Sequence, residues 1–310
     1  MTGYVLRRLA YMIPVFLLIS LFVFLMVRLV PGDPAAIMLG QRATDENVAQ
    51  LREKLKLDEP YWVQYGVFLQ NMAHGDLGES MRQRRPVTQI LLDRLPPTLF
   101  LVTYAGILSI LISGPLAAVA AMNRDRTIDH AVRVYALLSL AMPAYWIGMM
   151  LLQFFAVKNH VFPVAGYGEG FLGHLYSLFL PALALALAVS SILVRSLRNS
   201  IIETRDADYV RTARARGLGA RSIFLRHILR NSSMSTVTIL AVNLAFLVGG
   251  TTIIETIFAI PGIGQLIIKA IFDRDYPIIQ GITLAIGVLV LFINLLTDLS
   301  YAVLDPRVAY

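Results

Sequence analysis

The stretch DYVRTARARGLGARSIFLRHILRN, residues 208–231, lies between two apolar segments and is the most informative part of this chain. It belongs to a region with nine arginines and no lysine, at positions 195, 198, 205, 211, 214, 216, 221, 226 and 230. Loops that carry an excess of basic residues beside membrane spans stay in the cytoplasm. The segment is therefore predicted to be cytoplasmic, where such a loop can bind a partner.

The same stretch predicts two short helices. Asp206 or Asp208 is expected to cap the first helix, two alanines favour it, and Gly217 and Gly219 are expected to end it. The second helix is expected to have an apolar face, and the arginines between these apolar residues are expected to remain in contact with water. That face consists of Ile223, Phe224, Ile228 and Leu229.

Composition places the chain in a membrane. Its residues are 57% hydrophobic and its mean hydropathy is +0.66, whereas soluble domains are roughly 45–50% apolar. A helix needs about 20 apolar residues to cross the bilayer core. Six segments meet this requirement: Leu9–Val30, Leu99–Met122, Val132–Val157, Tyr176–Val194, Ser235–Ile257 and Ile278–Leu304.

The basic residues beside these spans predict the orientation. If all six segments cross, one side receives the nine arginines together with Arg7, Arg8, Arg124, Arg126, Arg133 and Arg307. The short loops on the opposite side carry only Lys158, Lys269 and Arg274. Both termini are therefore predicted to be cytoplasmic. The net charge of +7 reflects this topology rather than nucleic-acid binding.

Motifs of catalysis and cofactor binding are not found in the sequence. There is no cysteine, no phosphate-binding Gly-x-x-x-x-Gly-Lys-Ser/Thr loop and no His-Glu-x-x-His zinc helix. The five histidines share no ligand spacing. We therefore expect no cofactor on this chain and no enzymatic activity of its own.

The segment between Pro31 and Pro97 is predicted to be an extracytoplasmic insertion. A helix is expected near Asp45–Leu57, with Thr44 or Asp45 as its cap and Pro60 after its end. Aromatic residues then recur at helical spacing, at Tyr61, Trp62, Tyr65 and Phe68. They predict an amphipathic segment that lies on the membrane or packs within the insertion, or else contacts a ligand.

The segment from Tyr209 to Gly217, YVRTARARG, resembles the cytoplasmic signature of ATP-binding-cassette (ABC) importer permeases of the dipeptide and oligopeptide branch. This branch is similar to the glutathione and nickel permeases, and the match is to its first (B-type) permease subunit. Further matches occur in the same order along the chain: Arg7-Arg8-Leu9, Pro31-Gly-Asp-Pro34, His74-Gly-Asp-Leu-Gly78, Ala141-Met-Pro143, Glu255-Thr-Ile-Phe258, Pro261-Gly-Ile-Gly264, Arg274-Asp-Tyr-Pro277 and Asp305-Pro-Arg307.

The resemblance implies an all-α polytopic membrane protein with six transmembrane helices and the type I ABC importer fold. Its parts would be the first helix with the extracytoplasmic insertion (1–97), a five-helix core (98–304) and a cytoplasmic tail (305–310). The implied location is the bacterial cytoplasmic (inner) membrane. The implied partners are a second homologous permease, two ABC ATPase subunits, an extracytoplasmic solute-binding protein and membrane lipid, with no nucleic acid.

The resemblance also implies that the chain forms half of a translocation path for di- or oligopeptides or related small solutes, while partner chains hydrolyse ATP. Coupling to the ATPases is assigned by the resemblance to a cytoplasmic loop helix. The residues concerned are Tyr209, Arg211, Thr212, Ala213, Arg214, Ala215, Gly217 and Leu218.

Four polar residues near the fifth span are candidates for the translocation pathway: Asn243, Thr251, Thr252 and Glu255. Ionisable groups in spans usually mark pathways, but Glu255 and Asn243 could instead form hydrogen bonds within their own subunit. An ion-coupled secondary transporter is the alternative function, and an intramembrane enzyme is a third class. A secondary transporter would need carboxylates or an internal repeat near the midplane of the membrane. An intramembrane enzyme would need a nucleophile–base pair or a metal motif. The sequence shows neither.

Overall fold

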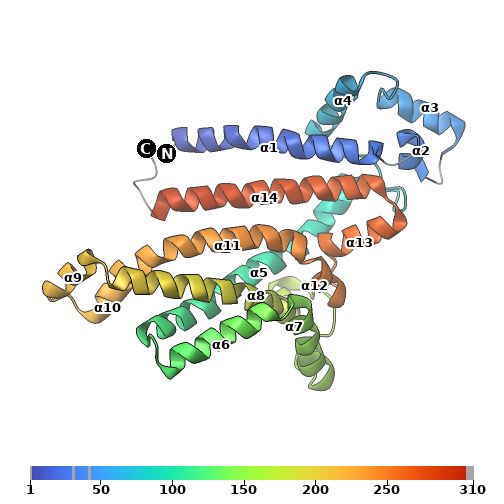
Figure 1. The fold of residues 1–310 in the computed structure, drawn as a ribbon. Coiled ribbons are helices and arrows are strands. Elements are labelled where there is room, and N and C mark those ends of the chain that lie inside the picture. Colours follow the sequence, from blue (N-terminus) through green and yellow to red (C-terminus); the bar gives the residue numbers. More distant parts are fainter. Residues whose placement is uncertain (1, 30–31, 41–42, 305–310) are drawn as a thin grey trace. The chain divides into compact units, whose positions relative to one another are not determined.

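The computed structural model describes residues 2–29, 32–40 and 43–304 of the chain (Figure 1). Every regular element in these ranges is a helix, and a single antiparallel bridge joins Glu79 to Pro86. The all-α prediction is therefore confirmed. The predicted tail, 305–310, and Val30 and Pro31 lie outside the described residues.

The helices follow one another with short connections. In chain order they are α1 (Thr2–Arg28), α2 (Pro34–Leu39), α3 (Asp45–Lys54), α4 (Tyr61–Ala73), α5 (Val87–Met122), α6 (Thr127–Ala141), α7 (Ala144–Leu151), α8 (Gly170–Arg205), α9 (Asp208–Ala215), α10 (Ala220–Ser222), α11 (Arg230–Gly250), α12 (Thr252–Ile257), α13 (Ile263–Asp273) and α14 (Tyr276–Leu304). Two π-helical stretches, Leu152–Lys158 and Ile223–Leu229, continue α7 and α10.

Four of the described helices are long and apolar enough to cross a membrane, and the number reaches six if two bent pairs each form one span. The six predicted spans match this larger number. Both α5 and α8 contain 36 residues, which at 1.5 Å per residue makes each about 54 Å long. Because the bilayer core is about 30 Å thick, both helices are long enough to extend beyond it.

The third predicted span is broken at Met142 and Pro143. The two helices that flank the break, Thr127–Ala141 and Ala144–Lys158, make an angle of 99°. Proline has no N–H to donate and pushes the preceding residue into extended conformation, and Met142 has φ −91° and ψ 127°. Proline alone is not sufficient for a break, since α8 continues through Pro181.

The chain divides into two compact units, which we describe separately. The first unit contains the residues up to Thr98 together with Pro261–Leu295. Its core is formed by the start of α5 and by α13 and α14, where Val87, Ile90, Ile263 and Ile282 are buried. The predicted boundary at residue 97 lies inside α5, which is continuous there.

The insertion is attached to α1 through α4. Tyr65 and Phe68 lie against the ring of Phe24, with ring centroids 5.3 and 5.7 Å away. Arg28 donates to Gln64 Oε1 from Nη2 at 2.7 Å and lies over the Phe24 ring. The predicted aromatic segment therefore packs on α1 through Tyr65 and Phe68, whereas Tyr61 and Trp62 are 68% and 76% exposed. Thr44 caps α3 as predicted, accepting from the backbone N–H of Asn47 at 3.3 Å.

A buried carboxylate joins the insertion to the loop before α14. Asp275 is 1% exposed, and its Oδ2 accepts from Ser80 Oγ at 2.6 Å and from the backbone N–H of Arg82 at 3.2 Å. Arg82 also pairs with Asp273 at 3.2 Å. Two segments almost 200 residues apart in sequence are thus held together by charge-assisted hydrogen bonds.

The second unit contains Leu99–Ile260 and the residues from Leu296 on. Helix α8 is its centre, because the apolar window of this helix is 67% buried and packs against α6, α7 and α11. Ala182, Ala184 and Ala186 are fully buried, and such small residues allow helices to approach closely in a membrane.

Candidate functional site

The predicted coupling loop forms helix α9, at one end of α8 and α11 (Figure 1). One side of α9 is anchored to the second unit: Val210 and Ala213 are 0% and 6% exposed. They join a buried cluster with residues from the ends of α5 and α8 and from the π-helical stretch, namely Ala117, Ala121, Leu197, Ile201, Ile223 and Ile228. The apolar face predicted for the second short helix is thus confirmed, and Ala213 packs inward.

The opposite side of α9 is exposed. Tyr209 and Leu218 are 45% and 44% exposed although both are large. Arg211, Thr212, Arg214, Ala215 and Gly217 are exposed as well. Among the described residues, Arg211 forms an ion pair only with the strongly exposed Asp208, at 3.6 Å, so its charge remains accessible to a partner protein. Of the predicted coupling residues, all except Ala213 therefore lie on one accessible surface, which we call the α9 surface.

The N-terminus of α9 differs from the prediction. Neither Asp206 nor Asp208 caps it, since the N-cap residue is Ala207 and no side chain accepts a hydrogen bond there. Asp208 is instead the first helical residue, where its charge still favours the helix dipole. The end of the helix agrees with the prediction, because Gly217 has φ +75°, a left-handed conformation that favours glycine. Gly219 does not end α9 but precedes α10 as its N-cap.

Asp129, in the first turn of α6, is fully buried and joins two arginines. Its two carboxylate oxygens accept from Arg198 Nε and Nη2 at 2.6 and 2.5 Å. Arg133 Nη2 donates to the same carboxylate at 2.6 Å, and the backbone N–H of Asp125 does so at 2.9 Å. We call Asp129, Arg133 and Arg198 together the arginine clasp, and it ties α6 to α8. Sequence analysis missed it, although the spacing of Asp129 and Arg133 by four residues on a helix is a signal for an ion pair.

The four pathway candidates lie on α11, on α12 or between them, and the structure shows their hydrogen bonds. Asn243 Nδ2 donates to Ile239 O at 2.7 Å, and Thr252 Oγ1 donates to Gly249 O at 3.0 Å. Thr251 is fully buried and donates to Glu255 Oε1 at 3.1 Å. Glu255 is also 0% exposed within the chain.

Glu255 therefore has the burial and the internal hydrogen bond that a structural role within its own subunit requires. We expect Glu255→Ala to reduce the thermal stability of the purified protein, because the buried Thr251 hydroxyl would keep only its longer hydrogen bond of 3.5 Å to Val248 O. Losing a buried hydrogen-bond partner costs about 1–3 kcal/mol. Glu255→Gln keeps an acceptor oxygen at the same position and should retain the melting temperature. A glutamine variant with normal stability but altered uptake kinetics would show instead that the charge acts in the pathway.

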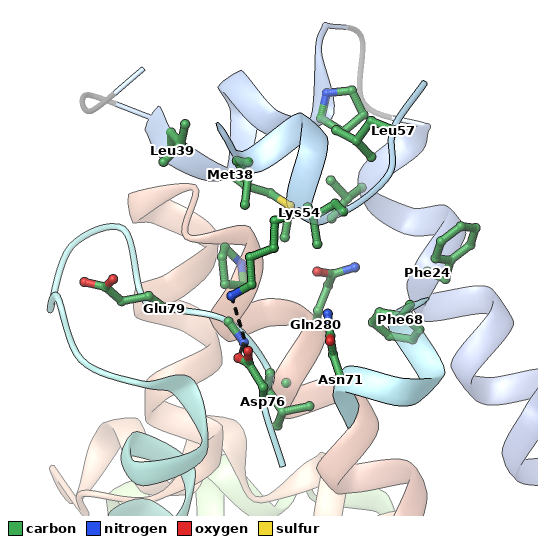
Figure 2. A pocket seen from close by; sticks show the side chains of 18 of the residues that line it. Phe24, Met38, Leu39, Lys54, Leu57, Phe68, Asn71, Asp76, Glu79 and Gln280 are labelled. Carbon is green, nitrogen blue, oxygen red and sulfur yellow. Dashed lines mark hydrogen bonds and ion pairs between the residues drawn. The ribbon is translucent and has the colours of Figure 1, made fainter. Parts of the chain in front are cut away.

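The first unit contains a cavity of about 250 Å³ between α1, the insertion and the start of α14 (Figure 2). Apolar side chains such as Phe24 and Phe68 form part of its wall. Lys54 and Asp76 form an ion pair of 3.5 Å at its edge, and both side chains are about half exposed or more. Gln280 also lines the cavity and donates to Val23 O at 2.9 Å. The sequence contained no sign of this cavity, because its lining comes from segments far apart in the chain.

Comparison with known proteins shows full-length relatives. A putative peptide transport system permease protein of Brucella abortus (strain 2308) is 40% identical over 313 residues, covering 100% of both chains. The dipeptide transport system permease protein DppB of Escherichia coli (strain K12) is 36% identical over 337 residues, covering 100% of this chain and 99% of the relative.

Solved structures show the same fold. The inward-facing methionine ABC transporter MetNI has a chain with a TM-score of 0.59 and 15% identity, covering 70% of this chain and 97% of that one. A chain of an amino acid ABC transporter has a TM-score of 0.54 and 16% identity, covering 68% of this chain and 92% of that one. The type I importer fold is therefore confirmed. Family models for the "binding-protein-dependent transport system inner membrane component" and its N-terminal part match residues 113–310 and 1–102, and this chain belongs to that family.

Proposed function

We propose that this permease forms half of the translocation path of an ATP-driven importer for dipeptides, oligopeptides or related small solutes. The peptide cargo is suggested by the names of relatives that match the whole chain, including a dipeptide permease. The other half of the path would be a second homologous permease. Two ATPase subunits would supply the energy, and an extracytoplasmic binding protein would deliver the solute.

The observation that carries the proposal is the α9 surface, which is accessible and basic although the helix beneath it is firmly anchored. Val210 and Ala213 connect α9 to the ends of α5 and α8 and to the π-helical stretch that leads into α11 through one buried cluster. A push on α9 by a closing ATPase would therefore reach several spans together. Packed elements transmit such rigid-body motion because close-packed cores deform little.

Charge supports the same assignment. Arg211 and Arg214 project from an exposed helix, and arginine is well suited to pair with carboxylates across an interface. Reversing both charges, Arg211→Glu with Arg214→Glu, should abolish copurification of the ATPase and solute uptake while the permease stays in the membrane. The matched control reverses two exposed arginines in another loop, Arg124→Glu with Arg126→Glu. Normal ATPase retention and uptake in the α9 variant would remove this helix from coupling.

We further propose that α9 and both termini face the cytoplasm, while the insertion faces the opposite side. The excess of arginine beside α8 and α11 supports this orientation. A tag placed within residues 205–221 should be protected in spheroplasts, whereas a tag within residues 44–85 should be accessible to added protease. A protected tag in the insertion would overturn the orientation.

A further inference from the structure

The second unit has a groove of about 270 Å³ between α6 and α8, beside the arginine clasp. It is lined by these two helices alone, and the functions considered above do not use it. One end of the groove is basic and the other is apolar. This combination of groups indicates a ligand that is itself charged at one end.

The basic end holds three guanidinium groups, from Arg133, Arg195 and Arg198. Asp129 fixes Arg198 from both Nε and Nη2 and also binds Arg133, whose Nη2 donates to Asp125 as well. Arg195 is exposed, and among the described residues no carboxylate forms an ion pair with it. The buried carboxylate thus orients two of the arginines, while the third keeps its full charge at the mouth of the groove.

The apolar end runs along the helices away from these charges. Leu137 and Leu140 are 64% and 50% exposed in the chain, and Ile192 lines the same groove from α8. Leu140 follows Arg133 by seven residues, which on a helix is about 10 Å. Both helices are apolar enough to belong to membrane spans, so the groove passes from the level of the lipid headgroups toward that of the acyl chains.

We propose that this groove binds an anionic phospholipid, with the phosphate on Arg195 and Arg133 and an acyl chain along Leu137, Leu140 and Ile192. Guanidinium groups bind phosphate oxygens through paired hydrogen bonds. Basic pockets between membrane helices on the cytoplasmic side suit anionic headgroups. The choice of leaflet rests on the orientation proposed above, but the binding chemistry does not.

A soluble anion or an acidic segment of a partner protein fits the groove less well. Either would satisfy the arginines, but neither would cover the exposed leucines that continue the groove at membrane depth. A phospholipid covers both ends with one molecule. It would also bridge α6 and α8 beside the clasp that already joins them.

The proposal can be tested on the complete transporter complex, purified and placed in nanodiscs of phosphatidylcholine with a small fraction of photoactivatable phosphatidylglycerol. Labelled peptides should map to residues 132–140 and 191–199. Photoactivatable phosphatidylcholine at the same fraction should label them much less. Because nanodiscs expose both leaflets, this result does not depend on the proposed orientation or on transport, and its failure would leave those proposals standing.

Arg195→Gln should lower the phosphatidylglycerol labelling about fivefold, the factor that corresponds to one basic residue near an anionic surface. This variant breaks no described ion pair, and Arg126→Gln removes the same charge outside the groove as a control. Equal labelling by both lipids, or no change in Arg195→Gln, would overturn the proposal. Labelling of the isolated chain but not of the complex would also overturn it, because a partner subunit would then cover the groove.

Discussion

Replacing Gly217 by valine is expected to lower ATP-driven uptake strongly while the permease remains in the membrane. Gly217 has φ +75°, and a β-carbon there would meet no other atom within 4 Å. The effect would therefore come from backbone strain and not from a clash. An L-residue in this conformation costs about 1–2 kcal/mol, and valine is worse than most because its side chain is branched at Cβ. The turn between α9 and α10 would change direction, and the α9 surface would move with it.

Initial uptake rates in membrane vesicles should fall at least about tenfold, the factor that corresponds to about 1.4 kcal/mol. Gly219→Val is the matched control, because Gly219 is also free of contacts but has φ −63° and ψ 144°, which valine adopts readily. Immunoblots should show equal amounts of both variants in the membrane. Equal uptake by the two variants would mean that the geometry of this turn does not matter for coupling.

Removing the buried carboxylate of the arginine clasp is expected to cause a large loss of stability. In Asp129→Ala, the Arg198 side chain, only 13% exposed, would lose the carboxylate that accepts from its Nε and Nη2 and would keep only Asn199 Oδ1 as an acceptor. Breaking a buried ion pair by deleting one partner costs about 3–5 kcal/mol, because an uncompensated charge stays behind. Thermal unfolding of the purified protein should begin at a clearly lower temperature, and less protein should accumulate in the membrane.

Two further variants separate charge burial from a general effect of mutation. Asp125→Asn removes the charge of a carboxylate that is 69% exposed and pairs with Arg133 at 2.8 Å, and exposed pairs contribute only about 0–1 kcal/mol. Asparagine also tolerates the φ of +60° at this position, so the variant adds no backbone strain. Replacing both members of the buried pair, Asp129→Leu with Arg198→Met, should recover most of the lost stability. If Asp129→Ala is no less stable than Asp125→Asn, the clasp does not stabilise α6 on α8.

Local patterns were sufficient to predict much of this molecule. The apolar segments, the positions of α3 and α9 and the inward face formed by Ile223 and Ile228 all follow from helical periodicity and charge. These signals depend on residues a few positions apart, and helices are stabilised by contacts over the same range. The left-handed turn at Gly217 was predictable for the same reason, since glycine adopts it without strain.

Other features were not predictable, because they depend on residues distant in sequence. The clasp needs Arg198 from α8 beside Asp129 from α6, and the insertion is held by Ser80 bound to Asp275. The prediction of an aspartate cap for α9 was wrong for a local reason. Ala207 occupies the N-cap position, so that Asp208 is the first residue of the helix. Proline also has different effects at two positions, because the helix breaks at Pro143 but continues through Pro181. The residue type alone therefore does not decide whether a helix breaks, and tertiary context can override local propensity.

The arginine clasp also has a consequence for how the chain is made. Arg198 follows Asp129 by 69 residues, and at about 5–20 residues per second the ribosome needs roughly 3–14 s to reach it. Arg133 is only four residues away and is added within about a second. The nascent α6 can therefore pair its carboxylate with Arg133 before α8 exists. Until Arg198 has been translated, Arg133 is the one of these two arginines that is available as a counter-ion for Asp129.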